Sequence, residues 1–292
     1  MIFAYPDFYS EFHCIAGDCQ HSCCKGWEID IDDESMERYK RIRGSFGKRL
    51  RASISEEPTP HFILTETGCC PFLEKNGLCS MISELGEESL CGICAEHPRF
   101  YNEYKDRTEV GLGLCCEEAV RLLMAGTEPL CIVEVDDGEG EREKPEAIIR
   151  RERIFAALSD ASLPLVERMK RMLALEHTEV IPFAPKTTAE FYEGLERMDA
   201  EWGKMLTKLR DAPLTEPEGI RYERMAEYLI YRHFTDEYAG EKAGAVLQFA
   251  VLSVRIIHAL ERLGYGNEAL RLYSAEIEYS DENLEKILAF LS

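Results

Sequence analysis

The sequence predicts a mainly α-helical protein, in which an irregular cysteine-rich N-terminal region with short helices precedes an α-helical C-terminal bundle. Eleven of the twelve cysteines fall between Cys14 and Cys116, where glycine and proline interrupt the chain often. Beyond residue 147, apolar residues recur three or four positions apart, as in amphipathic helices. No alternation of strand and helix patterns is visible. We therefore predict two domains, a metal-binding region at 1–133 and a helical domain at 147–292.

The N-terminal region predicts only short helices, at 34–43, 81–85 and 117–124. Hydrophobic periodicity is otherwise scarce, so we expect a bound metal to organise this region in place of a hydrophobic core. Residues 134–146 contain seven acidic residues and no periodicity. This segment predicts an exposed connector.

The C-terminal part predicts a series of helices separated by proline or glycine. Their expected ranges are 147–159, 163–176, 188–211, 219–239, 242–263, 267–274 and 281–290. The longest apolar stretch, 243–260, is interrupted by Gln248, Arg255 and His258. These polar residues favour a buried helix over a membrane span.

Charge and the N-terminal residues indicate where the protein works. The formal net charge is −21, which repels phosphate backbones and argues against a nucleic-acid partner. The chain opens without a basic, apolar signal segment. We therefore expect a soluble cytoplasmic protein with no membrane partner.

The cysteines indicate a metal centre. In a reducing compartment, dense cysteines point to metal binding or catalysis more than to disulfides. A single free cysteine is often only a small buried apolar residue, but eleven in one region are not explained that way. Only Cys91 and Cys94 have the paired spacing of a zinc knuckle. The pattern therefore favours an iron–sulfur cluster, with zinc as the alternative.

Four ordered blocks of the first 125 residues resemble the bacterial flagellin lysine-N-methylases, a branch of the cysteine-cluster zinc- or iron-chelating proteins. The first block runs from Phe12 to Asp32 and includes Gly26-Trp27. The others are Cys70-Pro71-Phe72-Leu73 with Gly77-Leu78-Cys79, Cys94 with His97-Pro98-Arg99, and Leu112 to Arg121 with Cys116 and Glu118-Ala119. This family commonly has tyrosine at the position of His97 and proline at the position of Glu117.

The resemblance implies a set of metal ligands and an activity. The family's cysteine positions fall on Cys14, Cys19, Cys23, Cys24, Cys70, Cys79, Cys94 and Cys116, whereas Cys69, Cys91, Cys115 and Cys131 are additional. The implied reaction transfers a methyl group from S-adenosylmethionine to a lysine of flagellin. The implied cofactors are a [4Fe-4S] cluster and S-adenosylmethionine.

Candidate residues for this chemistry are few. Trp27 is a candidate to stack on the sulfonium or adenine of the donor, and Arg99 to bind its carboxylate. Glu118 and Tyr101 are weaker catalytic candidates. Two other functions fit the cysteine pattern, namely a non-catalytic zinc- or iron-chelating protein and a redox or electron-transfer module.

Overall fold

The computed structural model describes residues 1–138 and 143–292. It divides into two compact units, which are described separately. The helical unit comprises Met1–Phe12, Tyr101–Cys115 and Ala119–Ser292, and the cysteine-rich unit comprises His13–Phe100 and Cys116–Glu118. Part of the predicted connector, residues 139–142, lies outside the described residues.

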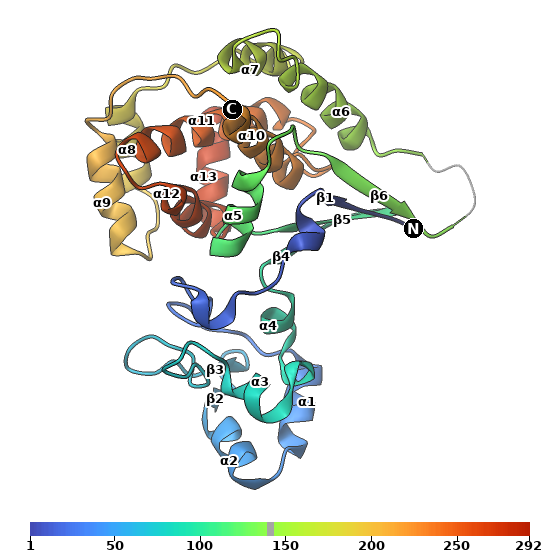
Figure 1. The fold of residues 1–292 in the computed structure, drawn as a ribbon, viewed down its shortest axis with the longest axis vertical. Helices are drawn as coiled ribbons and strands as arrows, with labels where there is room; N and C mark the ends of the chain where they lie inside the picture. Colours follow the sequence, from blue (N-terminus) through green and yellow to red (C-terminus); the bar gives the residue numbers. More distant parts are fainter. Residues whose placement is uncertain (139–142) are drawn as a thin grey trace. The chain divides into compact units, whose positions relative to one another are not determined.

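A mixed four-stranded sheet, in the order β4-β5-β1-β6, contains the N-terminal strand of the chain (Figure 1). Its strands are β1 (Ile2–Pro6), β4 (Arg99–Tyr104), β5 (Arg107–Leu112) and β6 (Ile132–Asp136). β1 is parallel to β5 and antiparallel to β6.

The predicted fold class is therefore wrong. Helices hold 51% of the residues and strands 11%, and the chain is not an irregular region followed by a helical bundle. β1 pairs with strands that follow it by about a hundred residues along the sequence. Local periodicity cannot reveal such a pairing, because it arises only from tertiary contact.

The helical unit holds most of the long helices. They are α6 (Glu146–Leu158), α7 (Leu165–Ala174), α8 (Pro185–Glu193), α9 (Ala200–Leu209), α10 (Ile220–His233), α11 (Ala243–Arg262), α12 (Asn267–Tyr273) and α13 (Asp281–Leu291), with a π-turn at Ser274–Glu278. The single helix predicted at 188–211 is two helices. α8 ends before Gly194, and α9 starts after Asp199, whose side chain accepts a hydrogen bond from the backbone N–H of Glu201 at 2.7 Å.

Two tyrosines of α10 form hydrogen bonds with the sheet. The Tyr231 hydroxyl lies 3.1 Å from the carbonyl of Ala4 in β1 and 3.0 Å from that of Val110 in β5. The Tyr228 hydroxyl donates to the carbonyl of Leu112 and accepts from its N–H, both at 2.6 Å. Both tyrosine rings are buried, so these bonds satisfy polar groups that would otherwise lose water without compensation.

α11 is the central helix of this unit. By length and composition it could cross a membrane, but 89% of its apolar window is buried within the structure, as in the core helix of a soluble protein. The prediction of a buried helix at this stretch is confirmed.

The cysteine-rich unit has short elements around an aromatic core. They are α1 (Asp33–Arg41), α2 (Gly44–Ala52), β2 (Ile54–Ser55), β3 (His61–Phe62), α3 (Ser80–Leu85) and α4 (Gly92–Glu96), together with the start of α5 (Glu117–Ala125). The rings of Tyr39, Phe62 and Phe72 are buried. The ring of Phe62 contacts the other two, with its centroid 6.2 Å from that of Tyr39 and 5.3 Å from that of Phe72. The expectation that this region lacks a hydrophobic core is wrong.

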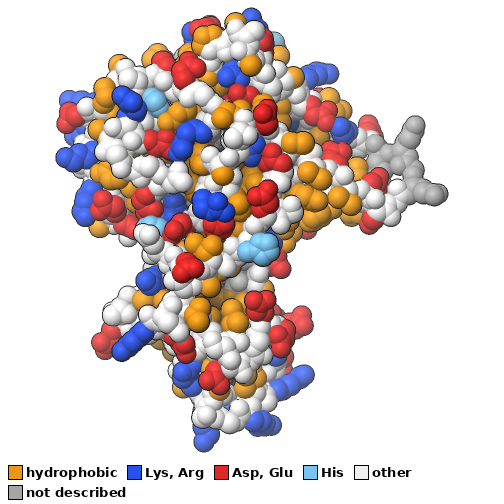
Figure 2. All heavy atoms as spheres, viewed as in Figure 1, with side chains coloured by type: hydrophobic (Ala, Val, Ile, Leu, Met, Phe, Trp, Pro, Cys, Tyr) orange, Lys and Arg blue, Asp and Glu red, His pale blue; other side chains and the backbone are white. Residues whose placement is uncertain are grey.

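The surface carries both signs of charge. The face drawn in Figure 2 has acidic and basic side chains interspersed, although acidic residues outnumber basic ones by 55 to 34 in the whole chain.

Candidate metal centre

Backbone pairing brings the second pair of adjacent cysteines to the first. The N–H of Cys70 donates to the carbonyl of Cys24 at 2.8 Å, and the N–H of Gly26 donates to Gly68 at 2.9 Å. A bridge between Lys25 and Cys69 lies between these two bonds. The segments are therefore antiparallel, and Cys24 and Cys70 are neighbours.

A turn at Gly77 brings Cys79 back beside the segment that follows Cys70. Leu73 and Cys79 form an antiparallel bridge, and the turn between them requires the positive φ of +80° that glycine adopts easily. The Sγ of Cys79 is half-buried beside the aromatic core.

Asp32 positions the segment that carries Cys91 and Cys94. Its carboxylate accepts hydrogen bonds from the N–H groups of Ser35 and Gly92, each at 2.8 Å. The first bond caps α1 and the second fixes the start of α4, which lies between the two cysteines. One carboxylate thereby links two helices that are 60 residues apart.

Five thiols gather on the aromatic core, and we call them the core-side group. They are Cys24, Cys70, Cys79, Cys91 and Cys94. Hydrogen bonds from the thiols of Cys23 and Cys70 lower the pKa of Cys24 to about 3, because they stabilise its thiolate. In the same way, the Cys94 thiol lowers the pKa of Cys91 to about 7.

Four further thiols form the loop-side group, which is more exposed. They are Cys14, Cys19, Cys23 and Cys116. The hydrogen bond to Cys24 and burial raise the pKa of Cys23, and the nearby charges of Cys14 and Cys116 raise it further. Burial raises the pKa of Cys19 to about 11, with smaller contributions from Glu117 and Cys116.

The start of α5 anchors the loop-side group. Oε2 of Glu117 accepts hydrogen bonds from the N–H of Gln20 at 2.9 Å and from the Sγ of Cys19 at 3.6 Å. Glu117 therefore connects the loop of Cys19 to the element that carries Cys116.

The chemistry of the donors fits a thiophilic metal group. All twelve cysteines are free thiols, and thiolates are the ligands of zinc and of iron–sulfur clusters. Within residues 1–138 and 143–292, however, no three His, Cys, Asp or Glu side chains are arranged to hold one metal ion. A zinc ion draws its sulfurs to within about 2.3 Å, whereas a polynuclear cluster binds each thiolate at a different iron atom.

The additional cysteines divide in three ways. Cys91 lies within the core-side group, so the sequence comparison missed a thiol that the fold places among the candidate ligands. Its spacing to Cys94 is the signal that could have identified it. Cys69 lies in the same unit, with its Sγ 3.7 Å from the carbonyl oxygen of Thr67. Cys115 and Cys131 belong to the helical unit.

The predicted donor-binding and catalytic residues belong to both units. Trp27, Arg99 and Glu118 belong to the cysteine-rich unit and Tyr101 to the helical unit. The indole N–H of Trp27 donates to the carbonyl of Cys23 at 2.7 Å, which holds the ring beside the loop-side thiols. Its ring also faces that of His97, with centroids 6.2 Å apart. Glu118 is buried, whereas Tyr101 is 45% exposed.

A buried hydrogen bond between a histidine and a glutamate in the helical unit was not predicted. Nε2 of His233 lies 2.8 Å from Oε2 of Glu278, and both side chains are buried. Burial alone would raise the pKa of Glu278, but the charge of Arg232 and the bond to His233 lower it to about 2. The pair joins the end of α10 to the π-turn. No local sequence motif indicates that these two residues interact.

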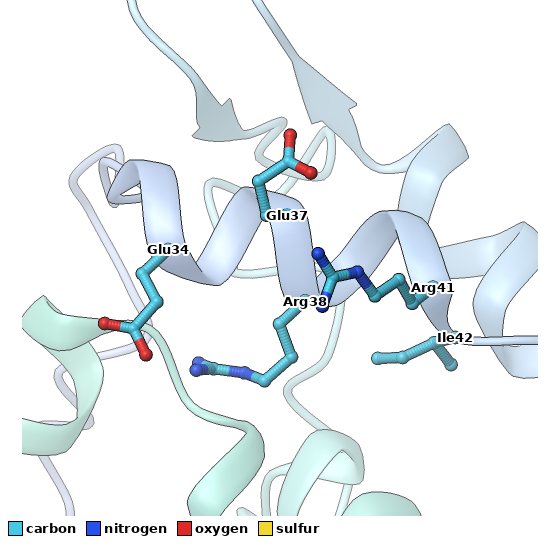
Figure 3. A pocket seen from close by; sticks show the side chains of 5 residues that line it. All are labelled: Glu34, Glu37, Arg38, Arg41 and Ile42. Carbon is cyan, nitrogen blue, oxygen red and sulfur yellow. The ribbon is translucent and has the colours of Figure 1, made fainter.

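Two hollows lie in the surface of the described residues. One, of about 510 Å³, is an open depression on α1 (Figure 3), lined by Glu34, Glu37, Arg38, Arg41 and Ile42. The other, of about 140 Å³, is mainly apolar and lies among α8, α11 and α13 in the helical unit. Neither is lined by a cysteine or by a predicted site residue.

Comparisons with known proteins relate this arrangement to a group of enzymes. The chain is 22% identical over 231 residues to lysine-N-methylases of Salmonella typhimurium and Salmonella choleraesuis. That match covers 77% of this chain and 53% of each relative, so the chain spans about half the length of these relatives. The flagellar biosynthetic protein FliU of Salmonella muenchen is 24% identical over 153 residues, which cover 50% of this chain and 88% of that protein.

No protein-family model matches the chain, and no solved structure matches it either. The resemblance predicted from the four sequence blocks is confirmed, since the chain is similar to proteins named lysine-N-methylase.

Proposed function

We propose that this protein is a lysine N-methyltransferase that uses S-adenosylmethionine and acts on flagellin. The observation that carries the proposal is the similarity over 77% of the chain to proteins named lysine-N-methylase. The similarity to a flagellar biosynthetic protein supports a flagellar substrate. A cytoplasmic location belongs to the same proposal, because twelve free thiols suit a reducing compartment.

The proposed reaction is a direct displacement. The neutral amine of lysine attacks the methyl carbon of the sulfonium, the N–C bond forms, and the S–C bond breaks with its electron pair going to sulfur. S-adenosylhomocysteine leaves, and the methylated ammonium loses a proton to a base or to water. Because a protonated lysine has no lone pair, the site must hold the lysine neutral and in line with the methyl group.

Trp27 is the residue that we propose for the sulfonium. Its indole N–H is engaged by the carbonyl of Cys23, so the ring orientation is fixed while the ring remains half-exposed. An aromatic face attracts a cationic methyl donor by its quadrupole. Arg99, in the same unit, is the candidate for the carboxylate of the donor.

The metal group of the proposal is an iron–sulfur cluster held by cysteines of the core-side and loop-side groups. The supporting observation is the gathering of free thiols on the aromatic core. When bound, such a cluster supplies a cross-link among chain segments that are distant in sequence. The aromatic core beneath the core-side thiols excludes water from one side of that group.

Methyl transfer is tested with the full chain, prepared without oxygen and loaded with iron and sulfide. The protein is incubated with methyl-labelled S-adenosylmethionine and purified flagellin, and modified lysines are identified by mass spectrometry. The expected result is label on flagellin lysines, and none when the lysines have first been acetylated. A metal-loaded chain that neither binds the donor nor labels flagellin refutes the proposal and supports a non-catalytic metal-binding protein.

The matched variants for this assay are Trp27→Phe and Trp202→Phe. Trp202 is the other tryptophan of the chain and is buried in the helical unit. If Trp27 binds the sulfonium, Trp27→Phe raises the KM for the donor severalfold, whereas Trp202→Phe leaves it unchanged.

A further inference from the structure

The smaller hollow, of about 140 Å³, lies within the helical unit, among α8, α11 and α13 (Figure 1). Its walls are mainly apolar and include Phe191 of α8, Val251 of α11 and Leu291 of α13. The side chains of Val251 and Leu291 are buried. An apolar cavity of about 150 Å³ holds a benzene molecule. The hollow therefore has room for the body of a small molecule with about six carbon atoms.

The mouth of the hollow is also apolar. Ile181 and Phe290 both line the hollow, and their side chains are 40% and 54% exposed. The ring of Phe290 stacks on that of Phe191, with centroids 4.3 Å apart. An apolar molecule that covers these side chains removes their surface from water, which favours binding.

Two of the polar residues that interrupt the apolar stretch of α11, Gln248 and Arg255, line the hollow. They are seven positions apart, so they lie on the same face of the helix. Both polar atoms of the Gln248 amide have partners in the chain. Nε2 donates to the carbonyl of Glu179, and Oε1 accepts the N–H of Ile181 at 3.4 Å. Gln248 therefore holds the segment before α8 and has a structural role.

The guanidinium of Arg255 is less well bonded, although the residue is only 7% exposed. Nη1 donates to the carbonyl of Ile181 at 3.4 Å and Nη2 to the carboxylate of Glu216 at 3.2 Å. Charge-assisted bonds are usually shorter, at about 2.7–2.9 Å. Nε is buried and has no hydrogen-bond partner among the described residues. A buried cationic donor without full bonding is costly, and an anion beside it would remove that cost.

We propose that this hollow binds a small carboxylic acid with an apolar body of about six carbon atoms. Its carboxylate accepts hydrogen bonds from Nε and one Nη of Arg255, and its body packs against Val251 and Phe191. An apolar cavity with one placed charge is the usual form of a small-molecule site. The guanidinium selects an anion over an amine. The site contains no cysteine and does not depend on the proposed methyl transfer.

The test uses hexanoate as the probe, with the full chain in a buffer free of carboxylates. Binding is followed by nuclear magnetic resonance titration of isotope-labelled protein. Hexan-1-ol and hexylamine supply the same apolar body with no charge and with a positive charge. The expected result is one hexanoate per chain, bound at least about tenfold more tightly than either analogue, because only the carboxylate forms charge-assisted bonds. Equal affinity for hexanoate and hexan-1-ol overturns the proposal.

Two substitutions at the polar end should change the affinity in opposite directions. Arg255→Met keeps an unbranched side chain but removes the guanidinium, so hexanoate should bind about tenfold more weakly. Arg262→Met, at the exposed end of the same helix, is the control and should bind as the wild type does. Glu216→Gln removes the carboxylate that competes for Arg255 and should strengthen binding. Unchanged affinity in Arg255→Met, or weaker binding in Glu216→Gln, overturns the proposal.

A third substitution blocks the hollow itself. Ala184 is exposed and lines the hollow, so Ala184→Phe places a ring there without altering buried packing. Hexanoate binding should be lost. Lys186→Phe adds the same ring at an exposed position that does not line the hollow, and binding should persist. Circular dichroism identifies misfolding of Arg255→Met, in which case Ala184→Phe decides the matter. Binding that survives Ala184→Phe overturns the proposal.

Discussion

The Sγ of Cys19 donates to Oε2 of Glu117 across 3.6 Å, although the two residues are 98 positions apart in the sequence. The same carboxylate oxygen accepts the N–H of Gln20 at 2.9 Å. One acidic side chain at the start of α5 thus fixes the loop that carries the first cysteines.

Glu117→Ala is expected to loosen that loop. Loss of a hydrogen bond worth about 1 kcal/mol predicts roughly fivefold faster hydrogen exchange in residues 14–23. Glu117→Gln is the control, because its amide oxygen still accepts the N–H of Gln20. Equal exchange rates in the alanine and glutamine variants would contradict the anchoring role of the carboxylate.

Asp32→Ala is expected to destabilise the cysteine-rich unit by about 1–2 kcal/mol, because it removes a helix cap and the link to Gly92. Hydrogen exchange in α1 and α4 should accelerate together. Asp33→Ala, at the next position of α1, changes the same residue type without removing either bond and serves as the control. Acceleration in α1 alone would show that the contact with Gly92 contributes nothing.

Gly113→Ala is expected to lower the melting temperature, with a loss of about 1–3 kcal/mol in the free energy of unfolding. A Cβ at Gly113 would lie 1.8 Å from the hydroxyl oxygen of Tyr279, so the ring must move. Gly240→Ala is the matched control, since a Cβ there meets no atom within 4 Å. Calorimetry compares the two variants, and equal melting temperatures would disprove the predicted clash.

The raised pKa of Glu227 predicts that the stability of the protein depends on pH. Burial raises its pKa to about 7, and the charge of Glu223 adds to this, while the N–H of Leu130 and the Ser159 hydroxyl oppose it. A carboxyl whose pKa is raised on folding stabilises the protein below its ordinary pKa, and this stabilisation is lost as the pH rises through about 7.

The wild-type free energy of unfolding should therefore fall by up to about 3 kcal/mol relative to Glu227→Gln between pH about 5 and about 8. Urea unfolding at both pH values measures the difference. Glutamine keeps an acceptor for the N–H of Leu130, which lies 2.7 Å from Oε2 in the wild type. A constant difference between the two proteins at both pH values would show that Glu227 does not titrate in this range.

The helices were largely predictable because their signal is local. Apolar spacing located both ends of α11 and the start of α10 within one residue, but α10 ends at His233, before the predicted end at 239. Gly264 and Pro213 marked real interruptions. The same apolar spacing wrongly predicted α8 and α9 as one helix. The capping role of Asp199 depends on a single side-chain bond, which is easily overlooked within a helical pattern.

The sheet and the grouping of the thiols were not predictable by the same means. Ile2–Pro6 is too short and isolated to indicate a strand without β5 and β6 beside it. The cysteine pattern gave the candidate ligands, but the division between Cys23 and Cys24 follows from the aromatic core, whose residues come from distant segments. Which cysteines pack against this core is known only from side-chain burial in the folded protein.

β1 is a central strand whose partners are synthesised about a hundred residues later. During translation its two edges therefore remain open while the entire cysteine-rich unit emerges from the ribosome. Open edges of this kind invite pairing with other chains. A cell producing this protein thus depends on rapid maturation of the intervening unit, and slow maturation is expected to appear first as aggregation of nascent chains.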